Sequence, residues 1–251
     1  MIDFNAPTQR LDLEMVRRGM VKSRARAQDL IKNGHVLIDG NTTRKPTKKV
    51  GLDIPITIDA PDIEWVGRGA LKLLAALDHF NIDPKGMTAA DIGASTGGFC
   101  QVLLKHEAKK VYAVDVGHGQ LDPLIAEDER VINLEKTNGR ALTSVLIPEP
   151  LDIVVSDVSF ISLKLALPAA LSLCRDGAIL LALVKPQFEV GKGNVGKGGI
   201  VRDPDLVRSV PIEMTNWINS LTGWHSLGII ESPIEGSDGN TEFLLGANYA
   251  A

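Results

Sequence analysis

The amino-acid sequence predicts an α/β protein in which a mostly parallel sheet covered by helices follows a small α+β domain. Beyond residue 66, short apolar runs alternate with helical patterns, the order typical of such a sheet. Before residue 60, two helical patterns precede short strand patterns. Charge divides as well: residues 1–60 hold eleven Lys and Arg against seven Asp and Glu, and the remainder holds sixteen against twenty-four. We therefore expect a first domain at 1–60, a linker at 61–66 and a second domain at 67–251.

The composition is that of an ordinary globular protein. With 251 residues, 44% of them hydrophobic and 23% charged, the chain can bury a sizeable core. Two cysteines are too few for a disulfide scaffold and indicate a reducing compartment. Charged residues interrupt the most apolar stretch, 165–184, and no signal peptide opens the chain, so a cytoplasmic protein without membrane attachment is expected. The five histidines lack paired metal-ligand spacing, so no metal is expected.

The first domain combines two helices with short strands. Residues 1–9 show no periodicity and are expected to fray. Ser23 is the expected N-cap of the second helix, and Gly34 its stop. The expected elements are helices at 10–19 and 23–34 and strands at 35–38 and 54–58.

Basic side chains gather around these two helices. Two interpretations stand: phosphate contacts with RNA, or a solvated charged face. Aromatic residues are scarce here, so structured RNA read by shape fits better than base stacking. The candidate RNA-binding residues are Arg10, Arg17, Arg18, Lys22, Arg24, Arg26 and Lys32, together with Arg68 of the second domain.

The second domain is predicted to be Rossmann-like, because its strands and helices alternate. The helix at 163–173 is expected to break or start at Pro168. The expected helices are 71–80, 98–106, 163–173 and 211–221, and the expected strands are 88–92, 111–116, 151–155, 178–184, 224–232 and 243–247.

A glycine-rich turn joins the strand at 88–92 to the following helix. The turn lacks the Gly-Lys-Ser/Thr ending of a P-loop, and Ser95 replaces the second glycine of a dinucleotide fingerprint. Asp91 would repel a pyrophosphate but attract a cationic sulfonium, which favours S-adenosylmethionine. The alternative is a tight turn whose glycines serve packing. The candidate cofactor-binding residues are Asp91, Gly93, Ala94, Ser95, Thr96, Gly97, Gly98 and Phe99.

Asp115 ends the next strand, 24 residues after Asp91, where its carboxylate can accept hydrogen bonds from two ribose hydroxyls. Asp115 and Val116 join the candidate cofactor site, as does Asp157. The alternative for Asp115 is a solvated residue at a strand end.

Two further polar residues directly follow apolar strands. Asp157 is expected beside the cofactor, with a helix N-cap as the alternative. Lys185 precedes a proline that favours extended backbone, and burial there would favour the neutral amine that can act as a base. Taken alone, Lys72 reads as a solvated helix lysine, and Glu242 has no distinctive context.

Six segments together resemble the TlyA family, also known as hemolysin A, whose members join an S4 domain to an FtsJ-like ribose 2′-O-methyltransferase domain. The most specific are Val114–Leu121 and Val195–Asp203. The resemblance implies an S4 RNA-binding domain, an S-adenosylmethionine cofactor, and ribosomal RNA or ribosomal subunits as partners. The six segments are 65–73, 90–99, 111–121, 153–163, 183–203 and 240–246.

The family's Lys-Asp-Lys-Glu tetrad falls on Lys72, Asp157, Lys185 and Glu242. The resemblance implies that Lys185 deprotonates a ribose 2′-hydroxyl or stabilises its charge, that Asp157 positions this lysine, and that the other two orient the ribose and the lysine.

Several alternatives stay open. The alternatives to an enzyme are a non-catalytic RNA-binding or ribosome-assembly factor and a membrane-active hemolysin. The glycine-rich segment 191–199, with Lys192 and Lys197, is either a loop near substrate RNA or a solvated flexible loop.

Overall fold

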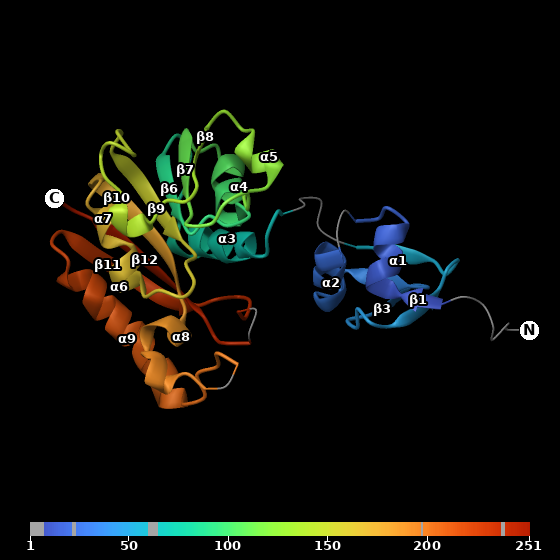
Figure 1. Ribbon diagram of the computed structural model, residues 1–251. Coiled ribbons are helices and arrows are strands. Elements are labelled where there is room, and N and C mark those ends of the chain that lie inside the picture. Colours follow the sequence, from blue (N-terminus) through green and yellow to red (C-terminus); the bar gives the residue numbers. More distant parts are fainter. Residues whose placement is uncertain (1–7, 22–23, 60–64, 197, 237–238) are drawn as a thin grey trace, which may run out of the picture. The chain divides into compact units, whose positions relative to one another are not determined.

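The computed structural model describes residues 8–21, 24–59, 65–196, 198–236 and 239–251. The chain divides into two compact units, residues 1–64 and 65–251 (Figure 1). This division falls within the segment predicted as a linker.

The first unit packs two helices against short strands. β1 pairs with β4, and a second sheet has the order β3-β2-β5. Its core includes Leu11 and Met15 of the first helix and Ile31 of the second, all fully buried. Its elements are β1 (Thr8–Arg10), α1 (Leu11–Arg17), α2 (Arg24–Lys32), β2 (Val36–Ile38), β3 (Asn41–Thr42), β4 (Lys49–Gly51) and β5 (Ile56–Ile58).

The second unit is built on a seven-stranded sheet of order β11-β12-β10-β9-β6-β7-β8. The five strands from β10 to β8 in that order run parallel, and β12 and β11 are antiparallel to their neighbours. The strands are β6 (Thr88–Ile92), β7 (Lys110–Val114), β8 (Val131–Leu134), β9 (Leu151–Ser156), β10 (Cys174–Val184), β11 (Trp224–Glu231) and β12 (Phe243–Tyr249).

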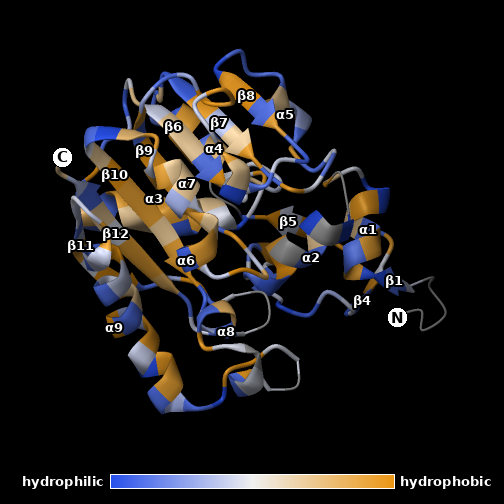
Figure 2. Cartoon of the chain, turned by 60° about the vertical axis from the view of Figure 1, so that its left-hand side comes forward, coloured by the Kyte–Doolittle hydropathy of each residue, from blue (hydrophilic) through white to orange (hydrophobic). Residues whose placement is uncertain are grey.

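Helices cover both faces of this sheet, and each face has its own core. One core holds Leu73 and Leu103, and the other holds Leu167 and Met214. The hydropathy colouring shows mainly hydrophobic central strands and an amphipathic α9 (Figure 2). The helices are α3 (Gly69–Phe80), α4 (Gly98–Lys105), α5 (Pro123–Ala126), η1 (Gly139–Ala141), α6 (Leu163–Ala166), α7 (Pro168–Leu171), α8 (Pro186–Glu189), η2 (Lys192–Asn194) and α9 (Pro204–Ser220).

The predicted α/β class is confirmed, but several elements differ from expectation. Thr8 and Gln9 do not fray, because β1 pairs with β4. The long helix near the C-terminal end begins at Pro204, not at Pro211, with the Asp203 side chain as its N-cap. The helix expected at 163–173 does break at Pro168, as predicted, into two four-residue helices. The short strand β8 was not predicted.

Candidate active site

Strand register brings three of the predicted site residues to one level. The last residues of β6, β7 and β9 are paired side by side. Gly93, Asp115 and Asp157 each come next in the chain, so they lie together at the carboxyl edge of the sheet. In parallel sheets this edge is where ligands bind.

The antiparallel strand β12 adds the remaining pieces. Val184, the last residue of β10, pairs with Phe243, the first of β12. Lys185 directly follows β10 and Glu242 directly precedes β12, so both residues lie beside this pair at the same edge of the sheet. Lys72 reaches the site from the first turn of α3.

The glycine-rich turn adopts the backbone its sequence favours. Gly93 has φ +88°, and a β-carbon there would lie 3.0 Å from the Asp157 carbonyl oxygen, so a side chain would displace this strand end. Ser95, which replaces the glycine of a dinucleotide fingerprint, also has positive φ, +47°. Its backbone N–H donates to Asp115 Oδ2 at 2.8 Å.

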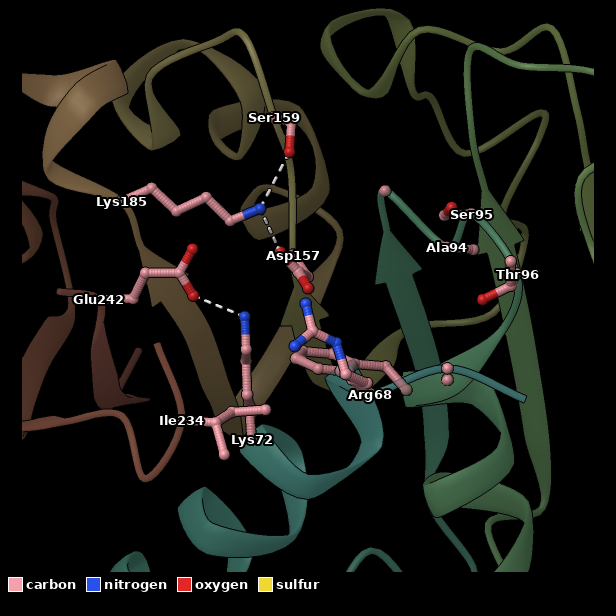
Figure 3. A pocket seen from close by; sticks show the side chains of 15 residues that line it. Arg68, Lys72, Ala94, Ser95, Thr96, Asp157, Ser159, Lys185, Ile234 and Glu242 are labelled. Atoms are coloured by element: carbon pink, nitrogen blue, oxygen red, sulfur yellow. Dashed lines mark hydrogen bonds and ion pairs between the residues drawn. The ribbon is translucent and has the colours of Figure 1, made fainter. Parts of the chain in front are cut away.

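Two cavities share this turn. The first, of about 290 Å³, has all four predicted tetrad residues in its wall (Figure 3). The second, of about 500 Å³, contains Asp115 and Val116 in its wall. Gly93, Ser95, Asp157 and Ser159 line both. Ala94, Thr96, Gly98, Phe99 and Arg68 line the first cavity only.

The charged side chains of the first cavity form two ion pairs. Lys72 Nζ lies 2.5 Å from Glu242 Oε2, and Lys185 Nζ lies 2.5 Å from Asp157 Oδ1 (Figure 3). The ammonium of Lys185 also donates to Ser159 Oγ at 2.9 Å. Both lysines are buried as whole residues, at 7% and 8% exposure. An ammonium held at a cavity wall can stabilise an oxygen that gains negative charge.

Asp91 occupies a different position from the one its charge predicted. It is buried at 1% exposure and absent from the walls of both cavities. Its Oδ2 accepts from the Cys100 thiol, and its Oδ1 has no hydrogen-bond partner among the described residues. Burial, aided by the charges of Asp157 and Asp115, raises the pKa of Asp91 to about 7. Gly97 also lies outside both cavity walls, packed toward Leu121.

Asp115 is held from two sides. Its second carboxylate oxygen accepts the Gly117 backbone N–H at 2.7 Å. The second cavity is also lined by Thr137, Asn138 and Gly139, which were not predicted, and the Thr137 backbone N–H donates to the Asp115 carbonyl oxygen at 2.9 Å. They follow β8, the strand that was also missed, and recognition of that strand would have placed them at this edge.

Several predicted RNA-binding arginines surround buried carboxylates. Asp12 is fully buried and accepts from Arg10, Arg24 and Gln28. The Arg10 guanidinium, with help from Arg24 and Gln28, holds the pKa of Asp12 far below its usual value. This cluster holds α1 to α2.

A second such cluster centres on Glu14, also fully buried. Arg17 donates to it at 2.6 and 2.8 Å, and Arg18 at 2.7 Å. These contacts lower the pKa of Glu14 to about 2, with Arg17 as the largest cause. Arg18 also donates to the carbonyl oxygens of Ile54 and Leu52, so its guanidinium holds the fold together.

The other basic residues are of three kinds: predicted residues that the structure describes, predicted residues outside the described ones, and exposed residues that were not predicted. Lys32 is exposed and Arg26 partly so, and Lys22 lies outside the described residues. Lys197 also lies outside them, as does the side chain of Lys192. Exposed basic side chains that sequence reasoning missed occupy the segment before and into β4. They are Arg44, Lys45, Lys48 and Lys49.

The glycine-rich segment at 191–199 is fixed at its end by a buried asparagine. Asn240 accepts from the Val201 backbone N–H at 3.1 Å and donates to the Gly199 carbonyl oxygen at 2.9 Å. Asn240 lies two residues before Glu242, so the segment is tied to the chain that carries the site glutamate.

Family models match both units. The model for FtsJ-like methyltransferases matches residues 65–249, and the model for the S4 domain matches residues 9–53. These matches confirm the family resemblance read from the motifs.

Individual relatives extend over nearly the whole chain. The 16S/23S rRNA (cytidine-2′-O)-methyltransferase TlyA of Mycobacterium tuberculosis is 47% identical over 94% of this chain and 88% of its own length. Hemolysin A of Brachyspira hyodysenteriae is 37% identical over 94% of this chain and 98% of its own. A solved structure from Streptococcus thermophilus, provisionally named a hemolysin, is 36% identical with a TM-score of 0.71, covering 97% of this chain and 89% of that one.

Proposed function

Because the chain belongs to the TlyA family of S4-containing, FtsJ-like methyltransferases, we propose that it methylates a ribose 2′-hydroxyl of ribosomal RNA with S-adenosylmethionine. The M. tuberculosis relative is named for cytidine in 16S and 23S rRNA, and we extend that target class to this chain. Among the described residues, no helix is long and apolar enough to cross a membrane.

One observation carries the proposal. Lys72, Asp157, Lys185 and Glu242 come from segments up to 170 residues apart, yet all four line one cavity. A second cavity shares a wall with it and contains Asp115. This arrangement provides a place for a reacting hydroxyl beside a place for a nucleoside-bearing methyl donor.

The residues of the second cavity fit the cofactor. Asp115 offers carboxylate acceptors for ribose hydroxyls, and its position is fixed by the backbone of Ser95 and Gly117. Gly93 lies so close to the Asp157 backbone that a side chain would not fit there, and as a glycine it leaves the turn open at that point. S-adenosylmethionine, when bound, supplies a methyl group attached to a positively charged sulfur.

The chain's own residues account for the remaining chemistry. As the neutral amine, Lys185 receives the hydroxyl proton while the oxygen takes the methyl group; as the ammonium, it instead stabilises the negative charge that develops on the oxygen. Asp157 holds this lysine in place. Lys72, paired with Glu242, presents a second cation at the same cavity and orients the ribose. Holding the reactants in line supplies much of the rate.

The first unit contributes RNA affinity in this proposal. Its exposed basic side chains, including Lys32, offer contacts to phosphate that depend on salt but not on sequence. The arginines around Asp12 and Glu14 build the fold on which these side chains stand.

The test is methyl transfer from radiolabelled cofactor to 16S and 23S rRNA, supplied both as free RNA and as ribosomal subunits. Digestion to nucleosides should recover the label as 2′-O-methylcytidine. Label in a base or in protein would overturn the reaction type, and label in another ribose would overturn the cytidine assignment. No incorporation into any rRNA or subunit, with the protein shown to be folded, would overturn the proposal as a whole.

A further inference from the structure

Ser159 is a polar residue of the site that lies outside the tetrad. It lines both cavities, and its hydroxyl accepts a hydrogen bond from Lys185 at 2.9 Å. The same ammonium pairs with Asp157 at 2.5 Å (Figure 3). The ion pair holds the nitrogen near Asp157, and the hydrogen bond to Ser159 directs one of its three N–H bonds, so together they restrict the ammonium more than the ion pair alone.

The segments after β9 and β10 meet at two further points. The rings of Phe160 and Phe188 lie 5.4 Å apart between centroids. Beyond them, Glu189 accepts from the Ser162 hydroxyl at 2.5 Å and from the Leu163 backbone N–H at 2.9 Å. The two segments thus contact each other at successive residues: Ser159 with Lys185, Phe160 with Phe188, and Ser162 with Glu189.

The turn that carries Ser159 needs such support. Phe160 has φ +67°, a left-handed conformation that is costly for a residue with a bulky side chain, and its side chain is exposed. Glu189 binds both the side chain of Ser162 and the first N–H of α6, directly after this turn. The carboxylate therefore fixes the far end of the strained segment to the helix that follows Lys185.

We propose that Ser159 is a positioning residue that aims the ammonium of Lys185, and that Glu189 holds the segment carrying Ser159. The inference rests on the proposed methyl transfer, because Lys185 is assigned its role there. A flexible four-carbon side chain with one ion-pair partner can swivel about that contact, whereas a hydrogen bond to a second, differently placed group restricts this rotation. Ser159 acts through the lysine and needs no contact with the cofactor.

The experiment compares Ser159→Ala, Ser159→Thr and Glu189→Ala, with Ser172→Ala as the matched control. Ser172 is an exposed serine bonded to the Ala169 carbonyl oxygen and absent from both cavity walls. We expect Ser159→Ala to lower kcat about tenfold, the effect of removing one hydrogen bond to a charged group, with KM for RNA and the Kd of cofactor unchanged. Ser159→Thr should restore most of kcat. Glu189→Ala should lower kcat in the same way, and the control should match the wild type.

A double-mutant cycle separates positioning from a merely structural effect. In a Lys185→Ala background, Ser159→Ala should cause no further loss, because the group it aims is gone. An equal tenfold loss in both backgrounds, or an unchanged kcat in the single variant, would overturn the proposal.

A second readout does not depend on methyl transfer. In protein labelled with ¹³C-lysine, the Lys185 Cε signal, assigned by its disappearance in Lys185→Arg, should show a restrained side chain in the wild type. Ser159→Ala should make that signal mobile, and Ser172→Ala should not. An already mobile signal in the wild type would overturn the positioning role, whether or not the protein methylates RNA.

Discussion

Both units of the molecule contain buried ion pairs, but among the described residues the cation is buried only in the pairs of the second unit's cavity. In the first unit the carboxylates of Asp12 and Glu14 are fully buried, and the arginines around them extend outward, with Arg17 half exposed. In the second unit the cations are buried too: Lys72 and Lys185 show 9% and 10% side-chain exposure. The first arrangement surrounds each acid with several donors, and the second gives each cation one carboxylate.

The difference separates ion pairs that stabilise a fold from those to which we assign a chemical role in the proposed reaction. A carboxylate surrounded by several guanidinium and amide donors has little capacity left to bind a ligand. Its ion pairs and hydrogen bonds instead hold the helices together. A lysine paired once at a cavity wall keeps donors for a substrate oxygen. Substitutions in the two units should therefore affect different measurements.

The largest effect should come from Lys185→Met. We expect methyl transfer to fall by about a thousandfold, within the range typical for loss of a general acid or base. Unfolding by denaturant should be nearly unchanged, because the paired Asp157 remains in contact with the cavity. An active variant, or one that has lost its fold, would erase the distinction drawn between the two units.

Glu14→Ala should act in the reverse sense. Removing this carboxylate leaves the guanidinium groups of Arg17 and Arg18 without their buried acceptor, which should destabilise the first unit by about 3 kcal/mol. Hydrogen exchange resolved by peptide should show reduced protection in residues 24–58 and no change in β6 or β9. Asp59→Ala, at an exposed position, is the control and should leave protection unchanged.

The pH dependence of stability should have opposite signs in the two units. The pKa of Glu14 is lowered from 4.5 to about 2, so its contribution is lost as pH falls across that interval. The pKa of Asp91 is raised from 3.8 to about 7, so its neutral form stabilises the fold at low pH and this contribution is lost as pH rises toward 7. Asp91→Asn should remove the loss between pH 4 and 7, measured by urea unfolding. A wild type with flat stability across that interval would contradict the assignment.

The smallest effect should come from exposed lysines. Lys48→Ala combined with Lys49→Ala should weaken rRNA binding and reduce the slope of log affinity against log salt by about one for each phosphate that the variant no longer binds. Stability should not change, since both side chains are exposed. Lys105→Ala, an exposed lysine of the other unit, is the matched control. A salt slope equal to that of the wild type would remove this segment from the RNA-binding surface.

The parallel core was predictable because its strands are buried on both faces. Residues 88–92 read as a strand and form β6 with the same bounds. The edge strand β8 was missed because two of its four residues, Ile132 and Asn133, are exposed and the pattern is short. Residues 137–139, which follow β8 in the chain and line the second cavity, were missed because this strand was not recognised.

The tetrad could be assigned from motifs, but the roles of the arginines could not. A run of basic residues looks the same whether its partner is a phosphate or a buried acid. Spacing alone held one clue, because Arg17 and Arg18 lie three and four residues after Glu14, the separations at which helical side chains meet. The assignment of individual residues to cofactor and RNA stays a prediction.

The place of β12 in the sheet has a consequence for how the protein is made. Glu242 directly precedes this strand, which follows the other described strands in the sequence yet lies between β10 and β11 in space. During synthesis, the ribosome releases Lys72, Asp157 and Lys185 long before the strand that aligns their glutamate. The tetrad can therefore be complete only after β12, the last of the described strands to be synthesised, has inserted between β10 and β11.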